Sequence, residues 1–90
     1  MTTMKRWNIE VFVGEDEGRT YAEARLLDNE IGDRLIGVGR AKLNPDDHDI
    51  PEIGDELAVA RALSDLGHRL LVVAAGDIQH ATREKVRLTH

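Results

Sequence analysis

Two segments of this chain present a face made almost entirely of small, uncharged side chains. In residues 20–26 and 35–43 every second residue is uncharged and would point to the same side of a strand. These residues are Thr20, Ala22, Ala24, Leu26, Leu35, Gly37, Gly39, Ala41 and Leu43. An alternation with a period of two is typical of a β-strand with one buried face. Because glycine and alanine occupy little volume, a helix can approach such a face closely. The pattern therefore predicts a sheet with a helix packed directly on these residues.

A third run of the same kind precedes these two segments. Trp7, Ile9, Val11 and Val13 alternate with Asn8, Glu10 and Phe12. We predict strands over residues 5–13, 19–28 and 34–43, connected by the turn-rich sequences GEDEG and DNEIGD. Connections this short favour an antiparallel meander. The uncharged residues of the first run belong to the face that we expect the helix to cover.

A helix is predicted over residues 52–75. Apolar or small residues recur there at steps of three and four, namely Leu57, Ala60, Leu63, Gly67, Leu70 and Ala74. Gly67 costs about 1 kcal/mol of helix propensity relative to alanine, which predicts either close packing against Gly37 or Gly39 or a bend. Gly76 is the expected C-terminal stop, followed by a tail over 77–90 with one short extra helical turn. The fold class is α+β, a β-β-β-α arrangement in a single domain spanning 1–90.

Composition restricts the classes of function. The chain has 90 residues, of which 41% are hydrophobic, so it is too apolar for intrinsic disorder. It has no cysteine, which excludes disulfides and thiolate chemistry. The net charge of −5 disfavours DNA and indiscriminate nucleic-acid binding. The sequence contains no apolar stretch long enough for a membrane span or a signal peptide, so we expect a cytoplasmic protein.

The stretch NPDDHDIPEIGDELA, from Asn44 to Ala58, contains six carboxylates and one histidine. Carboxylates near a helix N-terminus interact favourably with its positive end, and either Asp49 or Asp55 is a suitable cap. An EF-hand needs a glycine where its loop turns, and that glycine is missing. A hard-cation site built from Asp46, Asp47 and Asp49 is the alternative. We interpret the stretch as the beginning of a helix and predict no metal site.

Other motifs with catalytic potential have simpler explanations. The sequence GVGR at Gly37–Arg40 lies inside a predicted strand, whereas a dinucleotide-binding loop follows a strand and opens a helix. Ser64 and His68 are one helical turn apart, which is the spacing of a nucleophile and its base. Neither an orienting acid nor an oxyanion hole accompanies them. We therefore predict no catalytic residue, no cofactor site and no enzyme.

The opposite sheet face suggests two binding surfaces. Its apolar members form a predicted dimer or partner surface comprising Phe12, Leu27, Ile36 and Val38. Uncovered apolar patches often mark interfaces. Its cationic members form a predicted basic contact comprising Arg25, Arg40 and Lys42.

The segment GVGRAKLNPDDHDIPEIGDELAVARALSDL, from Gly37 to Leu66, resembles a family of small actinobacterial proteins classed as a domain of unknown function. The resemblance is densest in LNPDD and IGDELAVARALSDL, and it spans most of the chain. It implies a three-stranded antiparallel sheet with a long C-terminal helix, similar to the double-stranded-RNA-binding fold. Some mycobacterial relatives belong to the dormancy response, and one is dimeric and resembles ribosome hibernation-promoting factors in shape. No catalytic residues are established for the family.

These observations lead to one functional expectation and two alternatives. We expect a non-enzymatic stress or dormancy protein that acts through a homodimer or another protein partner. The first alternative is a hibernation-type factor that binds the ribosome or RNA. The position that such RNA-binding domains fill with lysines, at the start of the last helix, holds Glu52, Asp55 and Glu56 here. The second alternative is a small-ligand-binding protein or enzyme, for which close packing of the helix leaves little room.

Overall fold

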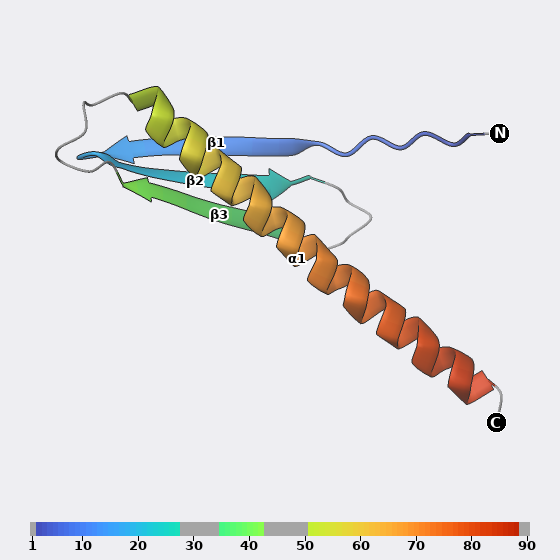
Figure 1. Ribbon diagram of the computed structural model, residues 1–90. Coiled ribbons are helices and arrows are strands. Elements are labelled where there is room, and N and C mark those ends of the chain that lie inside the picture. Colours follow the sequence, from blue (N-terminus) through green and yellow to red (C-terminus); the bar gives the residue numbers. More distant parts are fainter. Residues whose placement is uncertain (1, 28–34, 43–50, 89–90) are drawn as a thin grey trace.

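The computed structural model describes residues 2–27, 35–42 and 51–88. Strands β1 (Ile9–Asp16), β2 (Arg19–Leu26) and β3 (Leu35–Lys42) form an antiparallel sheet in the order β1-β2-β3. Helix α1 (Pro51–Leu88) follows and packs on one face of the sheet (Figure 1). This arrangement confirms the predicted α+β fold and its β-β-β-α order.

The turn between β1 and β2 is tighter than the sequence suggested. It consists of Glu17 and Gly18, with φ angles of 49° and 74°. Two central residues with positive φ are typical of a type I′ turn, whose twist matches that of the flanking strands. Residues 14–16, which we assigned to the turn, therefore pair with β2, and β1 ends at Asp16 opposite Arg19.

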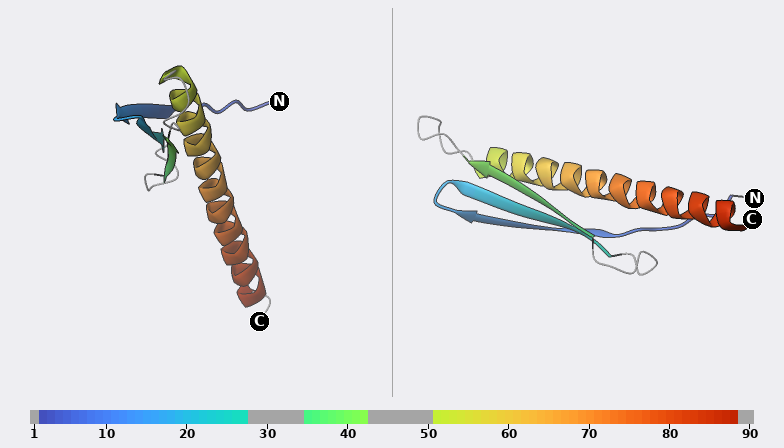
Figure 2. Two further views of the ribbon diagram at one scale, coloured as in Figure 1. Left: turned by 60° about the vertical axis from the view of Figure 1, so that its left-hand side comes forward. Right: turned by 90° about the horizontal axis from the view of Figure 1, so that it is seen from below.

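The small-residue face lies under α1 as predicted. The buried side chains of the sheet are Thr20, Ala22, Ala24, Leu26 and Ala41, and those of the helix are Ala58, Ala62 and Leu66. Gly37 and Gly39 lie directly beneath the helix backbone, so that a methyl group on Gly37 would overlap the carbonyl oxygen of Ala62. Figure 2 shows α1 on one side of the sheet only. The core is therefore thin and depends on contact between two backbones.

The helical row that faces the sheet differs from the predicted row. Gly54, Ala58, Ala62 and Leu66 are buried, whereas Leu57 and Leu63 are 44% and 42% exposed. A methyl group on Gly67 would meet no atom within 4 Å, so this glycine contacts neither Gly37 nor Gly39. The physical reason is size: the row of glycine and alanine permits backbone contact, while leucines at 57 and 63 would hold the helix away from the sheet.

The helix covers less of the sheet than we expected. Trp7, Ile9, Val11 and Val13 share the helix-facing side of the sheet, yet they are 49%, 45%, 40% and 45% exposed. The helix axis runs diagonally over the sheet (Figure 1), and the view from below shows it nearest to β3 and farthest from β1 (Figure 2). Close approach at Gly37 and Gly39 brings α1 onto the β3 side, which leaves the apolar side of β1 uncovered.

The end of the helix was predicted wrongly. We expected a stop at Gly76 and a tail over 77–90, whereas α1 continues to Leu88. Gly18 is the glycine with positive φ among the described residues, so Gly76 has ordinary helical geometry. The residues after it include alanine, arginine, glutamate and lysine, whose high helix propensity offsets the cost of one glycine. The C-terminal half of α1 extends past the sheet (Figure 1), and its described residues 74–82 are all exposed.

Candidate functional site

The outer edge of β3 is occupied by side chains of α1. The Val38 N–H donates to Asp65 Oδ2 at 2.8 Å, and Arg61 Nη1 donates to the Arg40 carbonyl oxygen at 2.7 Å. In an antiparallel sheet alternate residues direct their backbone groups away from the neighbouring strand, so these are groups of the free edge. Occupied edge groups are unavailable to the edge strand of another chain. The β3 edge is therefore protected at both positions.

The Asp65 carboxylate predicts a pH-dependent stability. The Val38 N–H and then the Arg69 guanidinium, 3.1 Å away, lower the pKa of Asp65. A carboxyl whose pKa is lowered in the folded state stabilises that state above its unfolded pKa, about 3.9, and this stabilisation is lost as pH falls through the folded pKa. We expect Asp65→Ala to lower the free energy of unfolding at pH 7, and the difference from the parent chain to be smaller at pH 3, because the carboxylate protonates as pH falls through the lowered folded pKa.

Urea unfolding at the two pH values measures this difference. Asp77→Ala, at an exposed position of the projecting part of α1, is the matched control. It removes a carboxylate that makes no hydrogen bond to the edge of β3. At pH 7 it should therefore change the free energy of unfolding less than Asp65→Ala does. An Asp65→Ala deficit of equal size at both pH values would contradict a role for the carboxylate charge.

Among the described residues, no strand pairs with the outer edge of β1. The Leu27 N–H donates to the Asn8 carbonyl oxygen at 2.9 Å, which makes this pair hydrogen-bonded across β1 and β2. By the alternation of an antiparallel ladder, Ile9, Val11 and Val13 direct their backbone N–H and C=O groups toward the free edge. All eight residues of β1 are exposed. We call the apolar side chains Trp7, Ile9, Val11 and Val13 the uncovered β1 strip.

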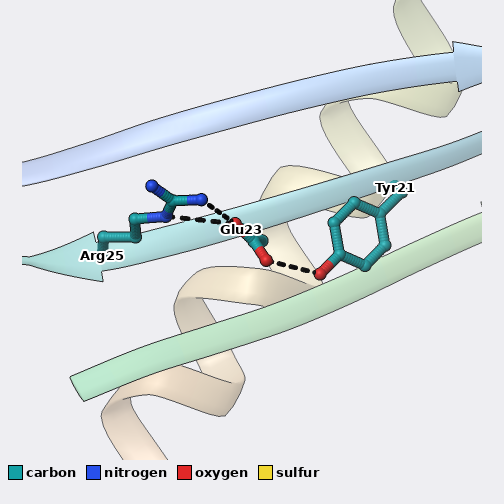
Figure 3. Close-up of polar contacts among 3 residues, drawn as sticks. All are labelled: Tyr21, Glu23 and Arg25. Atoms are coloured by element: carbon teal, nitrogen blue, oxygen red, sulfur yellow. Dashed lines mark hydrogen bonds and ion pairs between the residues drawn. The ribbon is translucent and has the colours of Figure 1, made fainter. Parts of the chain in front are cut away.

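A row of three hydrogen-bonded polar side chains, Tyr21, Glu23 and Arg25, runs along β2 on the sheet face opposite the helix (Figure 3). Tyr21 Oη donates to Glu23 Oε1 at 2.7 Å, and Arg25 Nε and Nη2 donate to Glu23 Oε2 at 3.1 and 2.6 Å. The Tyr21 hydrogen bond, and then that of Arg25, lower the pKa of Glu23. The same hydrogen bond raises the pKa of Tyr21. Glu23 is thus held as a carboxylate between two partners.

This row of polar side chains divides the predicted dimer surface. Phe12 on β1 and Val38 on β3 are separated by Glu23, which pairs with both in register. The Arg25 guanidinium lies over the Phe12 ring, 4.3 Å from its centre. Leu27 and Ile36 line a recess of about 210 Å³ together with Arg25. The four apolar residues therefore share a face of the sheet without forming one continuous patch.

The predicted basic contact is also divided. Arg25 forms an ion pair with Glu23 at 2.6 Å. Because Glu23 neutralises this guanidinium, Arg25 would attract an RNA phosphate less than the sequence suggested. Arg40 and Lys42 instead belong to a cleft of about 690 Å³ near the β1–β2 turn. The cleft is lined by Gly14, Glu15, Asp16, Arg19, Thr20, Tyr21, Arg40, Ala41, Lys42 and Arg61.

Two cations of this cleft were missed by sequence reasoning. Arg19 lies directly across from Lys42 in the β2–β3 register, and the period of two along β2 would have placed it on the same face as Arg25. Arg61 comes from α1 and reaches the edge of β3. No local pattern indicates that second placement, because it depends on where the helix crosses the sheet.

The acidic residues weighed as a cation site, Asp46, Asp47 and Asp49, lie outside the described residues. Among the described residues, no three histidine, aspartate or glutamate side chains are grouped so that they could hold a metal ion. Glu52 lies in the first turn of α1, as expected for a helix beginning. Ser64 and His68 are both exposed on α1. In the part of the chain that the structure describes, no helix is long and apolar enough to cross a membrane.

Comparison with known proteins places the chain in a family. The sequence profile of the Rv2632c-like family matches residues 5–87. The chain belongs to the Rv2632c-like family. It is 49% identical over 87 residues to the uncharacterized protein Mb1767 of Mycobacterium bovis, covering 97% of this chain and 90% of that protein. It is 43% identical over 86 residues to the uncharacterized protein Rv2632c of Mycobacterium tuberculosis, covering 96% and 90%.

A solved structure supports the same assignment. The crystal structure of Rv2632c superposes with a TM-score of 0.82 at 43% sequence identity, covering 90% of this chain and 94% of that chain. These relatives are described as uncharacterized proteins. Membership of the Rv2632c-like family therefore establishes the fold and the mycobacterial kinship of the chain, and it assigns no activity.

Proposed function

We propose that this Rv2632c-like protein is a non-enzymatic homodimer whose subunits pair through β1, and that it acts by binding a macromolecular partner. The supporting observation is the difference between the two sheet edges. Side chains of α1 occupy backbone groups of β3, whereas every residue of β1 is exposed. An open edge strand is a template for pairing with another chain.

Antiparallel self-pairing of β1 suits its side chains. With Val11 on the two-fold axis, Ile9 lies opposite Val13 of the partner subunit, so the uncovered β1 strips of both copies become neighbours on the helix-facing side. In the same register Arg6 lies opposite Asp16 of the partner subunit. Arg6 lies three residues before the start of β1 and Asp16 is its last residue, so the antiparallel arrangement brings opposite charges together at both ends. An isologous dimer of this kind closes on itself.

The direction of the backbone hydrogen-bonding groups along β1 supports the same register. Val11 directs its N–H toward the free edge, as do Ile9 and Val13. Pairs such as Ile9 with Val13 of the partner subunit therefore exchange backbone hydrogen bonds without disturbing the β1–β2 ladder. The dimer would contain a continuous six-stranded sheet with both helices on one face.

Sedimentation equilibrium at low micromolar concentration tests this interface. Val11→Pro removes an N–H that points away from β2, so the ladder to β2 remains intact. Each dimer loses two hydrogen bonds at its centre, so we expect dimerisation at least about tenfold weaker, with an unchanged far-ultraviolet circular dichroism spectrum. Phe12→Thr, which removes the apolar ring on the opposite face without adding a charge, should leave the dimer in place.

Two results would overturn the interface. A parent chain that is monomeric at these concentrations would remove the homodimer. A dimer that survives Val11→Pro and is lost in Phe12→Thr would assign the contact to the outer face, where the sequence alone had placed it.

The proposed cytoplasmic stress or dormancy role rests on the family resemblance. It predicts that the protein accumulates when cells of its source enter hypoxia, and that a dimer is recovered from them with a macromolecular partner. Immunoblotting across the transition, followed by native purification from the cytosolic fraction, measures both. Constant protein levels would contradict the stress role and leave the dimer proposal unaffected.

A further inference from the structure

The cleft beside the β1–β2 turn carries an excess of positive charge on an otherwise acidic protein. Its described lining includes the cations Arg19, Arg40, Lys42 and Arg61, against the acids Glu15 and Asp16. The whole chain has a net charge of −5. A cluster of cations that opposes the overall charge focuses a local field that attracts anions.

The cations of this cleft are available to a ligand. Among the side chains of residues 2–27, 35–42 and 52–82, none that is acidic forms an ion pair with Arg19, Arg40 or Lys42. Arg19 and Lys42 lie directly opposite each other in the β2–β3 ladder. Like charges in opposed positions are destabilising. Asp16 lies opposite Arg19 on the other side of β2 without forming an ion pair with it, and an anion between Arg19 and Lys42 would relieve the remaining repulsion. Arginine and lysine both bind phosphate well.

An aromatic ring lies beside these cations. The Arg40 guanidinium is 5.3 Å from the centre of the Tyr21 ring, and the ring is 37% exposed. The cross-strand neighbour of Tyr21 on β1 is Gly14, where an added methyl group would meet nothing within 4 Å. Space therefore exists beside Tyr21 for a second flat ring, and stacking of a base on an aromatic side chain is favourable.

The size and surroundings of the cleft favour a small ligand over a polymer. Its volume of about 690 Å³ lies in the range of small-molecule sites. An extended phosphodiester chain that followed β1 away from the cleft would pass Glu10, and the first turns of α1 carry Glu52, Asp55 and Glu56. The repulsion grows with every added phosphate.

We propose that this cleft binds a small phosphorylated molecule that carries an aromatic ring, of the nucleoside monophosphate or diphosphate class. Arg40, Lys42 and Arg19 contact the phosphate, and the Tyr21 ring stacks on the base. The cleft borders the proposed dimer interface at Gly14, Glu15 and Asp16 of β1, while its proposed phosphate contacts and its stacking ring lie on β2 and β3.

Isothermal titration of the full chain at low ionic strength tests this site with three probes: adenosine 5′-monophosphate, adenosine and inorganic phosphate. We expect saturable binding of the monophosphate, with inorganic phosphate and adenosine each weaker by about tenfold or more. Arg40→Gln combined with Lys42→Gln should weaken monophosphate binding by at least about tenfold, since each removes a charge-assisted contact. Arg69→Gln, on the exposed side of α1, is the matched control and should bind as the parent does.

Tyr21→Leu separates the two parts of the site. It should reduce monophosphate affinity to that of inorganic phosphate and leave phosphate binding unchanged. The proposal is overturned if the monophosphate does not bind, if phosphate alone binds equally tightly, or if the double variant binds as the parent does. Binding of a single-stranded oligoribonucleotide without binding of the mononucleotide would also overturn it and assign the cations to RNA.

Discussion

Replacing Gly39 by alanine is expected to lower the free energy of unfolding by about 3 kcal/mol or more, which is enough to unfold most of a small domain. The added methyl group would overlap the carbonyl oxygen of Ala58 and lie 2.9 Å from the carbonyl carbon of Arg61. Both are backbone atoms of a helix, so relief requires the whole helix to move away from the sheet. Gly37→Ala should behave similarly, because its methyl group would lie 2.7 Å from Cβ of Leu66.

The chain provides a matched control in Gly67. This residue lies on the same helix, but a methyl group there would meet no atom within 4 Å. Gly67→Ala should therefore raise the free energy of unfolding by about 0.5–1 kcal/mol through helix propensity alone. Urea denaturation followed by circular dichroism measures all three variants. Equal stability of Gly39→Ala and the parent would show that the helix does not contact the sheet backbone.

Leu66→Ala is expected to cost about 2–5 kcal/mol, which again is a large share of the stability of so small a domain. Leu66 is the largest fully buried side chain among the described residues, with 2% of its surface exposed. Alanine at this position would leave a cavity between α1 and the sheet, because backbone contact at Gly37 prevents the helix from moving closer.

Leu63→Ala is the informative comparison, since position 63 belongs to the row that the sequence predicted to face the sheet. Leu63 is 42% exposed, so its truncation should cost about 1 kcal/mol or less. Both variants should be compared at one protein concentration, because dimerisation would make stability concentration-dependent. A greater loss for Leu63→Ala than for Leu66→Ala would show that the helix is rotated relative to this structure.

Much of the fold followed from local patterns. The alternation in each strand depends on a geometric period of two, and it correctly placed Ala22, Ala24, Gly37 and Gly39 on the buried face. Short turn-rich connections correctly predicted the meander. The helix began near the position expected from its acidic first turn, at Pro51.

The candidate surfaces were harder to predict. The apolar residues Phe12 and Val38 were assigned to the correct face, but the pattern could not show that Glu23 and Arg25 divide them. The open edge of β1 was missed because edge exposure depends on which strand the helix protects. Asp65 and Arg61 reach β3 from positions 27 and 21 residues away in sequence, and no spacing rule connects them.

The amino-acid sequence by itself determined the type and order of the elements, since period, turn chemistry and helix capping act between neighbouring residues. Only the tertiary structure decided which row of α1 meets the sheet, which edge stays open and how far the helix extends. In the sequence the leucines of α1 were the stronger hydrophobic signal. The row of glycine and alanine faces the sheet instead, because it permits contact between the two backbones. The free energy gained from this close packing outweighs that of burying larger side chains at a greater distance.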